Sequence, residues 1–307
     1  MTRSGAAIEL EAFLSAIRAD YSVSAPVMWE LAGIHCFTDP ATGSSCKLYH
    51  GTYQYFMLLD LKRGILNDSR FIISQVRELA IRDNCRRILI TGTADYSMLA
   101  HIAWAFRSTP SRPEITVVDR CQTALSINAW YARKYSLEIN LVRSDLFEYD
   151  APWQYDAICT HNILNFFSFD DRLRLTRKWH DLLRPGGCVV TMTRLRLGSD
   201  DKAGGFTPQQ VSSIYERTYQ AATEYGSGLG IEPGILAGVA EEFADDYKRF
   251  MWKGEEDVHD CFNNAGLQLI TPATASVSLQ TPDLHVSPGA RSAARLLIVA
   301  RKPVKHY

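Results

Sequence analysis

Between residues 86 and 194 the chain alternates short, apolar, β-rich runs with longer amphipathic segments, and this alternation constrains its fold more than any other feature. The β-rich runs cover residues 88–90, 115–118, 139–142, 155–159 and 188–192. Strands that alternate with helices are typical of βαβ units and therefore of a parallel sheet. Ligands of such sheets bind beyond the carboxyl ends of the strands, so we expect the functional residues to follow the β-rich runs.

The sheet is expected to continue after residue 194, with a helical insertion in between. Two further β-rich runs, 267–279 and 294–301, would close it with a hairpin. The insertion covers 203–253 and is predicted to hold one helix over 208–225 and a second over 235–252. We therefore predict an α/β fold with a doubly wound, mostly parallel, seven-stranded sheet.

Residues 1–85 differ from the rest of the chain because helical spacing there is combined with a stretch rich in aromatic side chains. A turn is expected at 39–43, and residues 67–69 have the composition of a helix cap. We predict that residues 1–85 form a helical N-terminal cap, or lid, over a ligand-binding domain of residues 86–307.

The composition is that of an ordinary globular protein, since 46% of the 307 residues are hydrophobic, 22% are charged and the net charge is −1. This balance argues against nucleic acid or a membrane as a partner, and no apolar run approaches the ~18 residues of a membrane-spanning helix. Seven cysteines without CxxC spacing, and an N-terminus without the apolar core of a signal peptide, indicate reduced thiols and a cytoplasmic location. The expected partner is a small molecule, and no particular oligomeric state is predicted.

Four short motifs accompany the β-rich runs. They are Gly92 after the first run, Asp119 at the end of the second, Asp145-Leu146 after the third and Leu183-Arg184-Pro185-Gly186-Gly187 before the fifth. With these motifs in this order, the chain resembles the class I methyltransferases that depend on S-adenosylmethionine (SAM) from residue 86 to about residue 302. The resemblance implies that SAM is the ligand.

The resemblance also implies a role for each motif. The carboxylate of Asp119 would accept hydrogen bonds from both ribose hydroxyls, and Asp145 would accept one from the adenine amino group. Each also has a plainer interpretation, because Asp119 could be a solvated residue at the start of a helix and Asp145 a loop residue. The residues predicted to bind SAM are Gly92, Thr93, Asp95, Asp119, Arg120, Asp145, Leu146 and Thr160.

The glycine-rich turn departs from the family pattern, which is an acidic residue followed by three glycines at every second position. Here Ile90 occupies the acidic position, Gly92 is kept, Ala94 replaces the second glycine and Tyr96 replaces the third. In the family the acidic residue helps to hold the α-ammonium group of SAM. Its contact must come from Asp95 or from the cap, or the amine is left unpaired.

Three aromatic side chains of the cap, Tyr49, Tyr53 and Phe56, share one face of a predicted helix. They could pack the cap onto the rest of the protein, or they could surround the SAM sulfonium, since an aromatic face attracts a desolvated cation by ~2 kcal/mol. Both roles could hold for different members of the set.

The reaction favoured by the resemblance is methyl transfer from SAM to a small metabolite. An unpaired α-amine would instead favour cyclisation, because a neutral amine can attack as a nucleophile. In its altered turn and aromatic cap the chain is similar to the azetidine-2-carboxylate synthases, which close a four-membered ring on SAM and release 5′-methylthioadenosine. A third alternative is a SAM-binding protein without catalytic activity.

The catalytic candidates combine the end of the fourth β-rich run with the cap. They are His161, Tyr53, Tyr49 and Asn162, with His50 as a further optional base. No group of histidine, cysteine and acidic residues has the spacing of metal ligands, so the sequence predicts no metal site.

Overall fold

The computed structural model describes residues 3–38, 45–62, 64–196, 204–276 and 293–304. It contains a seven-stranded sheet, whose strands are β1 (Arg87–Thr91), β2 (Glu114–Asp119), β3 (Ile139–Arg143), β4 (Tyr155–Cys159), β5 (Leu183–Arg196), β6 (Gln268–Ser276) and β7 (Ala293–Arg301). The strand order is β3-β2-β1-β4-β5-β7-β6. The first five strands run parallel, and β7 is antiparallel to both of its neighbours.

This topology confirms the predicted α/β fold with a mostly parallel sheet of seven strands. The connection between β6 and β7 and the turn expected at 39–43 lie outside the described residues.

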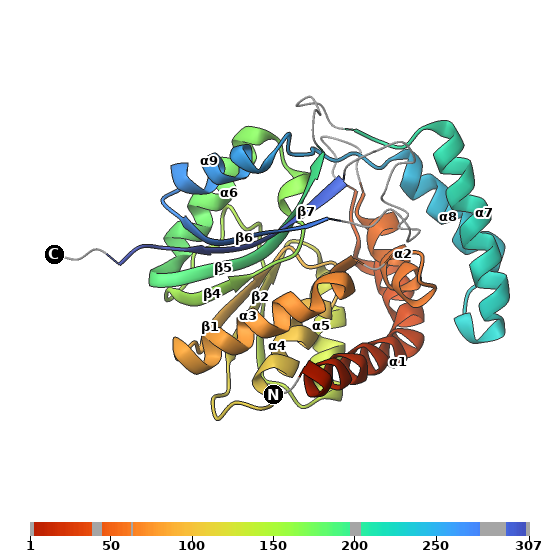
Figure 1. Cartoon of the computed structure of the whole chain (residues 1–307). Helices are drawn as coiled ribbons and strands as arrows, with labels where there is room; N and C mark the ends of the chain where they lie inside the picture. The colour runs from red at the N-terminus through yellow and green to blue at the C-terminus, as the bar shows by residue number, and fades with distance from the viewer. Residues whose placement is uncertain (1–2, 39–44, 63, 197–203, 277–292, 305–307) are drawn as a thin grey trace.

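Helices cover both faces of the sheet, as Figure 1 shows. One face carries α3 (Ser69–Arg82), α4 (Ser97–Phe106) and α5 (Gln122–Lys134), and the other carries α6 (Phe169–Leu182) and α9 (Glu255–Asn264). In β1, Ile88 and Ile90 join the apolar core on the first side and Leu89 joins the core on the second. All three are fully buried, which explains why a central parallel strand reads as a continuous apolar run.

Four helices lie to one side of this layered core: α1 (Arg3–His35), α2 (Lys47–Leu58), α7 (Pro208–Tyr225) and α8 (Pro233–Asp245) (Figure 1). The first of these contacts α2, α4 and α5, and α2 in turn contacts α8. Within this group Phe56 packs on Phe243 with ring centroids 6.1 Å apart. The N-terminal helices and the insertion therefore meet each other at one edge of the core.

Tyr96, which replaces a glycine of the family pattern, is fully buried beneath the cap. Its ring stacks on Tyr131 at 4.6 Å, and its hydroxyl lies 2.8 Å from Ser24 Oγ of α1. A glycine at this position would leave a space the size of a tyrosine under α1. The Tyr96 side chain thus provides part of the surface on which α1 packs.

Two local predictions were wrong. The second insertion helix ends at Asp245 rather than at residue 252, because the Trp252 side chain is buried near β5 and its Nε1 donates to Thr193 Oγ1 at 2.7 Å. Asp68 stands at the N-cap position of α3, but its side chain does not cap the helix. The Asp68 carboxylate instead bonds to His161 and to Arg295.

Candidate functional site

A cavity of about 350 Å³ lies beyond the carboxyl ends of the first four strands. Its wall is made of the segments that directly follow these strands, together with α2 and residues around it. All twelve residues predicted to bind SAM or to act in catalysis line it: Tyr49, Tyr53, Gly92, Thr93, Asp95, Asp119, Arg120, Asp145, Leu146, Thr160, His161 and Asn162. Their individual roles toward a ligand stay predictions.

Asp119 ends β2 and holds the turn after β1 in place. Its Oδ2 accepts from the Thr93 N–H at 3.1 Å, and its Oδ1 accepts from the Cys121 N–H at 2.8 Å. Burial raises the pKa of the Asp119 carboxyl to about 6. Each oxygen has a second lone pair, so the carboxylate retains two acceptor positions for a ligand.

Gly92 is required by the backbone of this turn. Its φ is +57°, and a β-carbon there would overlap the side chain of Ile163. Asp145 follows β3, and its Oδ1 accepts from the Phe147 N–H at 2.9 Å, which leaves its other oxygen for a ligand. The hydroxyl of Thr160 donates to the Thr91 carbonyl at 2.8 Å, so this side chain joins β4 to β1.

Asp95 is bonded to the cap and to the start of α4. Its Oδ2 accepts from Gln54 Nε2 at 3.0 Å, and its Oδ1 accepts from the Ser97 N–H at 2.9 Å. Gln54 Oε1 accepts from Ser24 Oγ at 2.8 Å, so a chain of hydrogen bonds continues to Tyr96. The Asp95 side chain therefore ties α2 to the glycine-rich turn.

His161 and Asp68 form a buried pair at the end of β4. His161 Nε2 lies 2.9 Å from Asp68 Oδ2, and Arg295 bonds to the same carboxylate oxygen. Burial lowers the pKa of His161. Burial acts against ionisation of Asp68, but the hydrogen bond from His161 and the charge of Arg295 outweigh it and the pKa of Asp68 is lowered. A neutral His161 that donates from Nε2 keeps Nδ1 as a proton acceptor.

Asn162 follows His161 with a left-handed backbone, φ +55°. Its N–H donates to the Met192 carbonyl at 3.0 Å, which fixes the residue against β5. Within the described part of the chain, Asn162 Oδ1 is buried without a hydrogen-bond partner. A buried acceptor of this kind is suited to a donor group of a bound ligand.

Three cationic residues that sequence reasoning missed also line the cavity: Lys62, Arg194 and Arg249. Lys62 Nζ lies 4.6 Å from the ring centroid of Tyr53 and 5.4 Å from that of Tyr49. These tyrosines therefore already make a cation–π contact with Lys62, the kind of contact that was one of the two roles considered for them from sequence. Lys62 and Arg249 lie in connecting segments that carry no sequence motif. Arg194 lies within β5, where it pairs with Arg295 of β7.

The sequence has no run with metal-ligand spacing, but the structure brings four possible metal ligands together. Ligand atoms of Cys36, Cys46, His50 and Cys121 all lie within 4.8 Å of one another. The four positions are scattered over 86 residues, so no local spacing marks them, and the packing of α1 against α2 and α5 brings them together. All seven cysteines are free thiols.

The sequence matches no protein-family model, and it has no significant match among curated proteins. Solved structures do match: the [4+2]-cyclase SpnF has a TM-score of 0.50 and 17% identity, over 77% of this chain and 81% of that chain. A putative sarcosine dimethylglycine methyltransferase from Galdieria sulphuraria has a TM-score of 0.49 and 13% identity, over 78% and 87% of the two chains. A SAM-dependent methyltransferase from Clostridium acetobutylicum has a TM-score of 0.49 and 11% identity, over 82% of this chain and 97% of that chain.

The chain shares the overall fold of SpnF. At 17% identity this similarity establishes the fold alone. No helix in the described ranges is long and apolar enough to cross a membrane.

Proposed function

We propose that this protein binds SAM in the cavity at the carboxyl ends of β1–β4 and transfers its methyl group to a small molecule. The observation that carries the proposal is the position of Asp119, which ends β2, and of Asp145, which follows the neighbouring strand β3, because both line one cavity. Both carboxylates keep acceptor positions after their backbone contacts are counted. Two such acceptors suit the ribose hydroxyls and the adenine amino group of one nucleoside.

The cations of the cavity suit the other end of the ligand. Lys62, Arg194 and Arg249 would attract the carboxylate of the methionine moiety or of an acidic acceptor. Arg249 belongs to the insertion, and its guanidinium lies 3.4 Å from the ring centroid of Phe166. This stacking holds the positive charge in place, so the insertion contributes to ligand binding as well as to packing.

Methyl transfer requires mainly alignment and exclusion of water. A lone pair of the acceptor attacks the methyl carbon, the carbon–sulfur bond breaks with its electrons going to sulfur, and S-adenosylhomocysteine leaves. His161 would take the proton released by the acceptor, because Asp68 holds its Nε2–H and leaves Nδ1 as the base. Asn162 Oδ1 would accept a hydrogen bond from the ligand or the acceptor.

A second candidate is cyclisation of SAM itself, favoured by the surroundings of the expected ammonium position. Ile90 is fully buried and has no carboxylate, and the Asp95 carboxylate already accepts three hydrogen bonds, from Gln54, from the Ser97 N–H and from the Ser97 hydroxyl, so it has fewer open acceptor positions for an ammonium group than Asp119 has. In this reaction the neutral α-amine attacks the γ-carbon of the methionine chain, and the carbon–sulfur bond breaks. 5′-Methylthioadenosine leaves, and the new ring nitrogen loses one proton.

One experiment separates these functions. Purified protein is incubated with SAM alone and then with a panel of small acceptors, and products are measured by mass spectrometry. S-adenosylhomocysteine that appears only with an acceptor supports the methyltransferase, whereas methylthioadenosine formed from SAM alone supports the cyclase. Binding in calorimetry without any product supports a non-catalytic SAM-binding protein. If SAM does not bind, the proposed function is wrong.

A further inference from the structure

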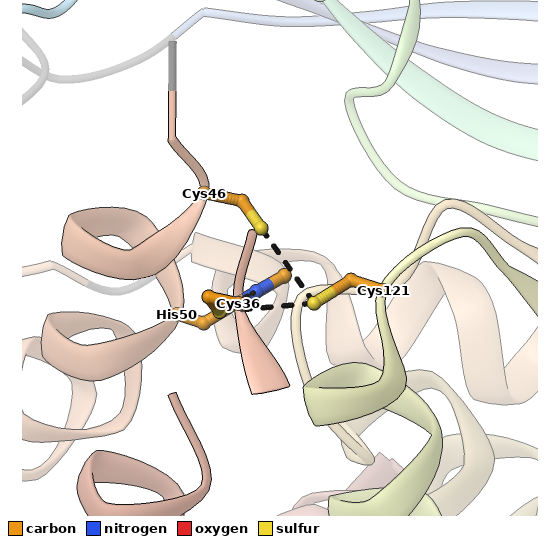
Figure 2. Close-up of side chains that lie close together, drawn as sticks. All are labelled: Cys36, Cys46, His50 and Cys121. Carbon is orange, nitrogen blue, oxygen red and sulfur yellow. Dashed lines mark hydrogen bonds between the residues drawn. The ribbon is translucent and has the colours of Figure 1, made fainter. Parts of the chain in front are cut away.

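Three helix ends meet where the cap contacts the ligand-binding domain, and each contributes a cysteine. Cys36 directly follows α1, Cys46 directly precedes α2, and Cys121 stands at the N-cap position of α5. His50 lies one turn into α2, so it shares a face of that helix with Cys46. Figure 2 shows the three thiols and the imidazole pointing toward one another.

The distances within this cluster match those around a tetrahedral zinc ion. Cys121 Sγ lies 3.7 Å from Cys36 Sγ and 3.6 Å from Cys46 Sγ, and Cys36 Sγ lies 3.3 Å from His50 Nδ1. Zinc–sulfur bonds of about 2.3 Å at tetrahedral angles separate two sulfurs by about 3.8 Å, and sulfur and nitrogen by about 3.6 Å. The same sulfurs are too far apart for a disulfide, whose S–S bond is about 2.05 Å.

The composition and electrostatics of the cluster also favour a metal. A disulfide between two of the cysteines would leave the third thiol and the imidazole without a function, whereas Cys₃His is a common ligand set of structural zinc. Cys46 and Cys121 both lie at helix N-termini, where the helix dipole stabilises a thiolate. Thr123 Oγ1 lies 3.2 Å from Cys36 Sγ and supplies a neighbouring polar contact.

We infer that Cys36, Cys46, His50 and Cys121 bind one Zn²⁺ ion. Four protein ligands fill a tetrahedral coordination sphere, so the site is structural, with no open position for a substrate or water. It joins the end of α1 and the start of α2 to the start of α5. In sequence, Cys46 lies 75 residues and Cys36 lies 85 residues before Cys121. The ion is thus a crosslink between the cap and the sheet domain.

The crosslink lies directly beside the proposed ligand. Cys46, His50 and Cys121 line the cavity, and the Cys121 N–H donates to Asp119 Oδ1 at 2.8 Å. Zinc would therefore hold α2 against the cavity and fix the backbone donor that orients Asp119. This consequence rests on the proposed SAM function, whereas the metal site itself does not.

The first test measures metal in the full-length protein, purified without chelators, by inductively coupled plasma mass spectrometry. We expect about one zinc per chain. Replacement of the metal with Co²⁺ should produce visible d–d bands of a tetrahedral ion and a thiolate-to-cobalt charge-transfer band in the near ultraviolet. A metal-free protein whose cobalt spectrum lacks these bands, or stoichiometric iron or copper in place of zinc, would overturn the inference. So would a disulfide within the cluster, found by mass spectrometry after alkylation without reduction.

The second test compares Cys36→Ser and Cys46→Ser with the matched control Cys261→Ser. Cys261 is more deeply buried than Cys36 and Cys46, and it packs near Thr176 between α6 and α9, away from the cluster, so its replacement tests whether loss of a buried thiol alone affects zinc binding. The two cluster variants should bind zinc at least about tenfold more weakly, and the control should keep it. Unchanged zinc affinity in both cluster variants contradicts the ligand assignment. If these variants do not fold, the cobalt spectrum of the wild-type protein still decides.

The third test removes zinc with a chelator and follows amide hydrogen exchange in α2. Faster exchange in α2, together with weaker SAM binding, is expected if zinc positions the cap. Unchanged exchange contradicts the crosslinking role. If the intact protein never binds SAM, the proposed function fails, but metal content, the cobalt spectrum and hydrogen exchange still test the zinc site.

Discussion

Replacement of Asp119 with alanine tests the centre of the proposed site. The carboxylate accepts from the backbone of Thr93 and of Cys121, it lines the cavity, and it has two remaining acceptor positions. Asp119→Ala removes all four. The two backbone contacts affect the folded protein with or without ligand, whereas the two ribose contacts affect only the complex.

The expected loss of affinity follows from the number of ligand bonds. Each charge-assisted hydrogen bond contributes ~1.5–3 kcal/mol, so two of them amount to ~3–6 kcal/mol. This corresponds to a Kd for SAM that is about 10²- to 10⁴-fold higher. Asp145→Ala should cost less, about 10- to 10²-fold, because the adenine amino group gives a single hydrogen bond.

Isothermal titration calorimetry with SAM measures both losses. Glu148→Ala is the matched control, because this exposed glutamate follows β3 but does not line the cavity. Thermal unfolding and zinc content of each variant show whether the fold and the neighbouring Cys121 are intact. A folded Asp119→Ala protein that binds SAM within about twofold of wild type refutes the ribose assignment.

Four further predictions address the reaction, the cap and the pH dependence. If the protein is a cyclase, Ile90→Asp should bind SAM but form little methylthioadenosine, because the new carboxylate keeps the α-amine protonated. The uncharged Ile90→Asn variant should retain more activity. A folded, SAM-stabilised Ile90→Asp protein that cyclises SAM as fast as wild type would exclude this reasoning. Tyr96→Ala should lower the free energy of unfolding in urea titrations by about 3–5 kcal/mol, and Tyr96→Phe should lower it by about 1 kcal/mol. If Tyr96→Ala lowers it by no more than Tyr96→Phe, the packing of the N-terminal helices does not depend on this ring. A chain that begins at Arg86 should aggregate or bind SAM poorly, which light scattering and calorimetry check; a soluble truncation with full affinity would show that the cap is dispensable. Burial lowers the pKa of His101 to about 4, so the unfolded chain binds more protons than the folded protein between that value and the ordinary 6.5. The free energy of unfolding should therefore fall by up to about 3 kcal/mol as the pH decreases through this window, and a His101→Gln variant with the same pH profile would contradict the assignment.

The strands and the candidate ligand contacts were accessible from sequence because their signals are local. A central parallel strand is apolar on both faces, so Ile88, Leu89 and Ile90 identify β1 without knowledge of its neighbours. Asp119 is found in the same way, as the acidic residue at the end of the apolar run 115–118 of β2. Since the carboxyl ends of parallel strands meet at one edge, these residues could be assigned to one site before the structure was known.

Other features depended on contacts that sequence periodicity does not report. Helical spacing continued toward residue 252, but burial of Trp252 and its bond to Thr193 end the helix earlier. Asp68 has the composition of a helix cap, yet its carboxylate is drawn to His161 and Arg295 from distant strands. In each case a long-range hydrogen bond in the protein interior outweighs a local preference of about 1 kcal/mol.

The sequence by itself determined the parallel sheet, the edge at which its ligand would lie and the acidic residues offered there, because each follows from a pattern within a few neighbouring positions. Only the tertiary structure decided why Tyr96 replaces a glycine, which cations surround the cavity and that Cys36, Cys46 and Cys121 meet beside it. The physical reason is the packing of α1 on α2, α4 and α5. That packing joins residues dozens of positions apart, and the side-chain chemistry at such a contact is set by distance in space rather than by spacing along the chain.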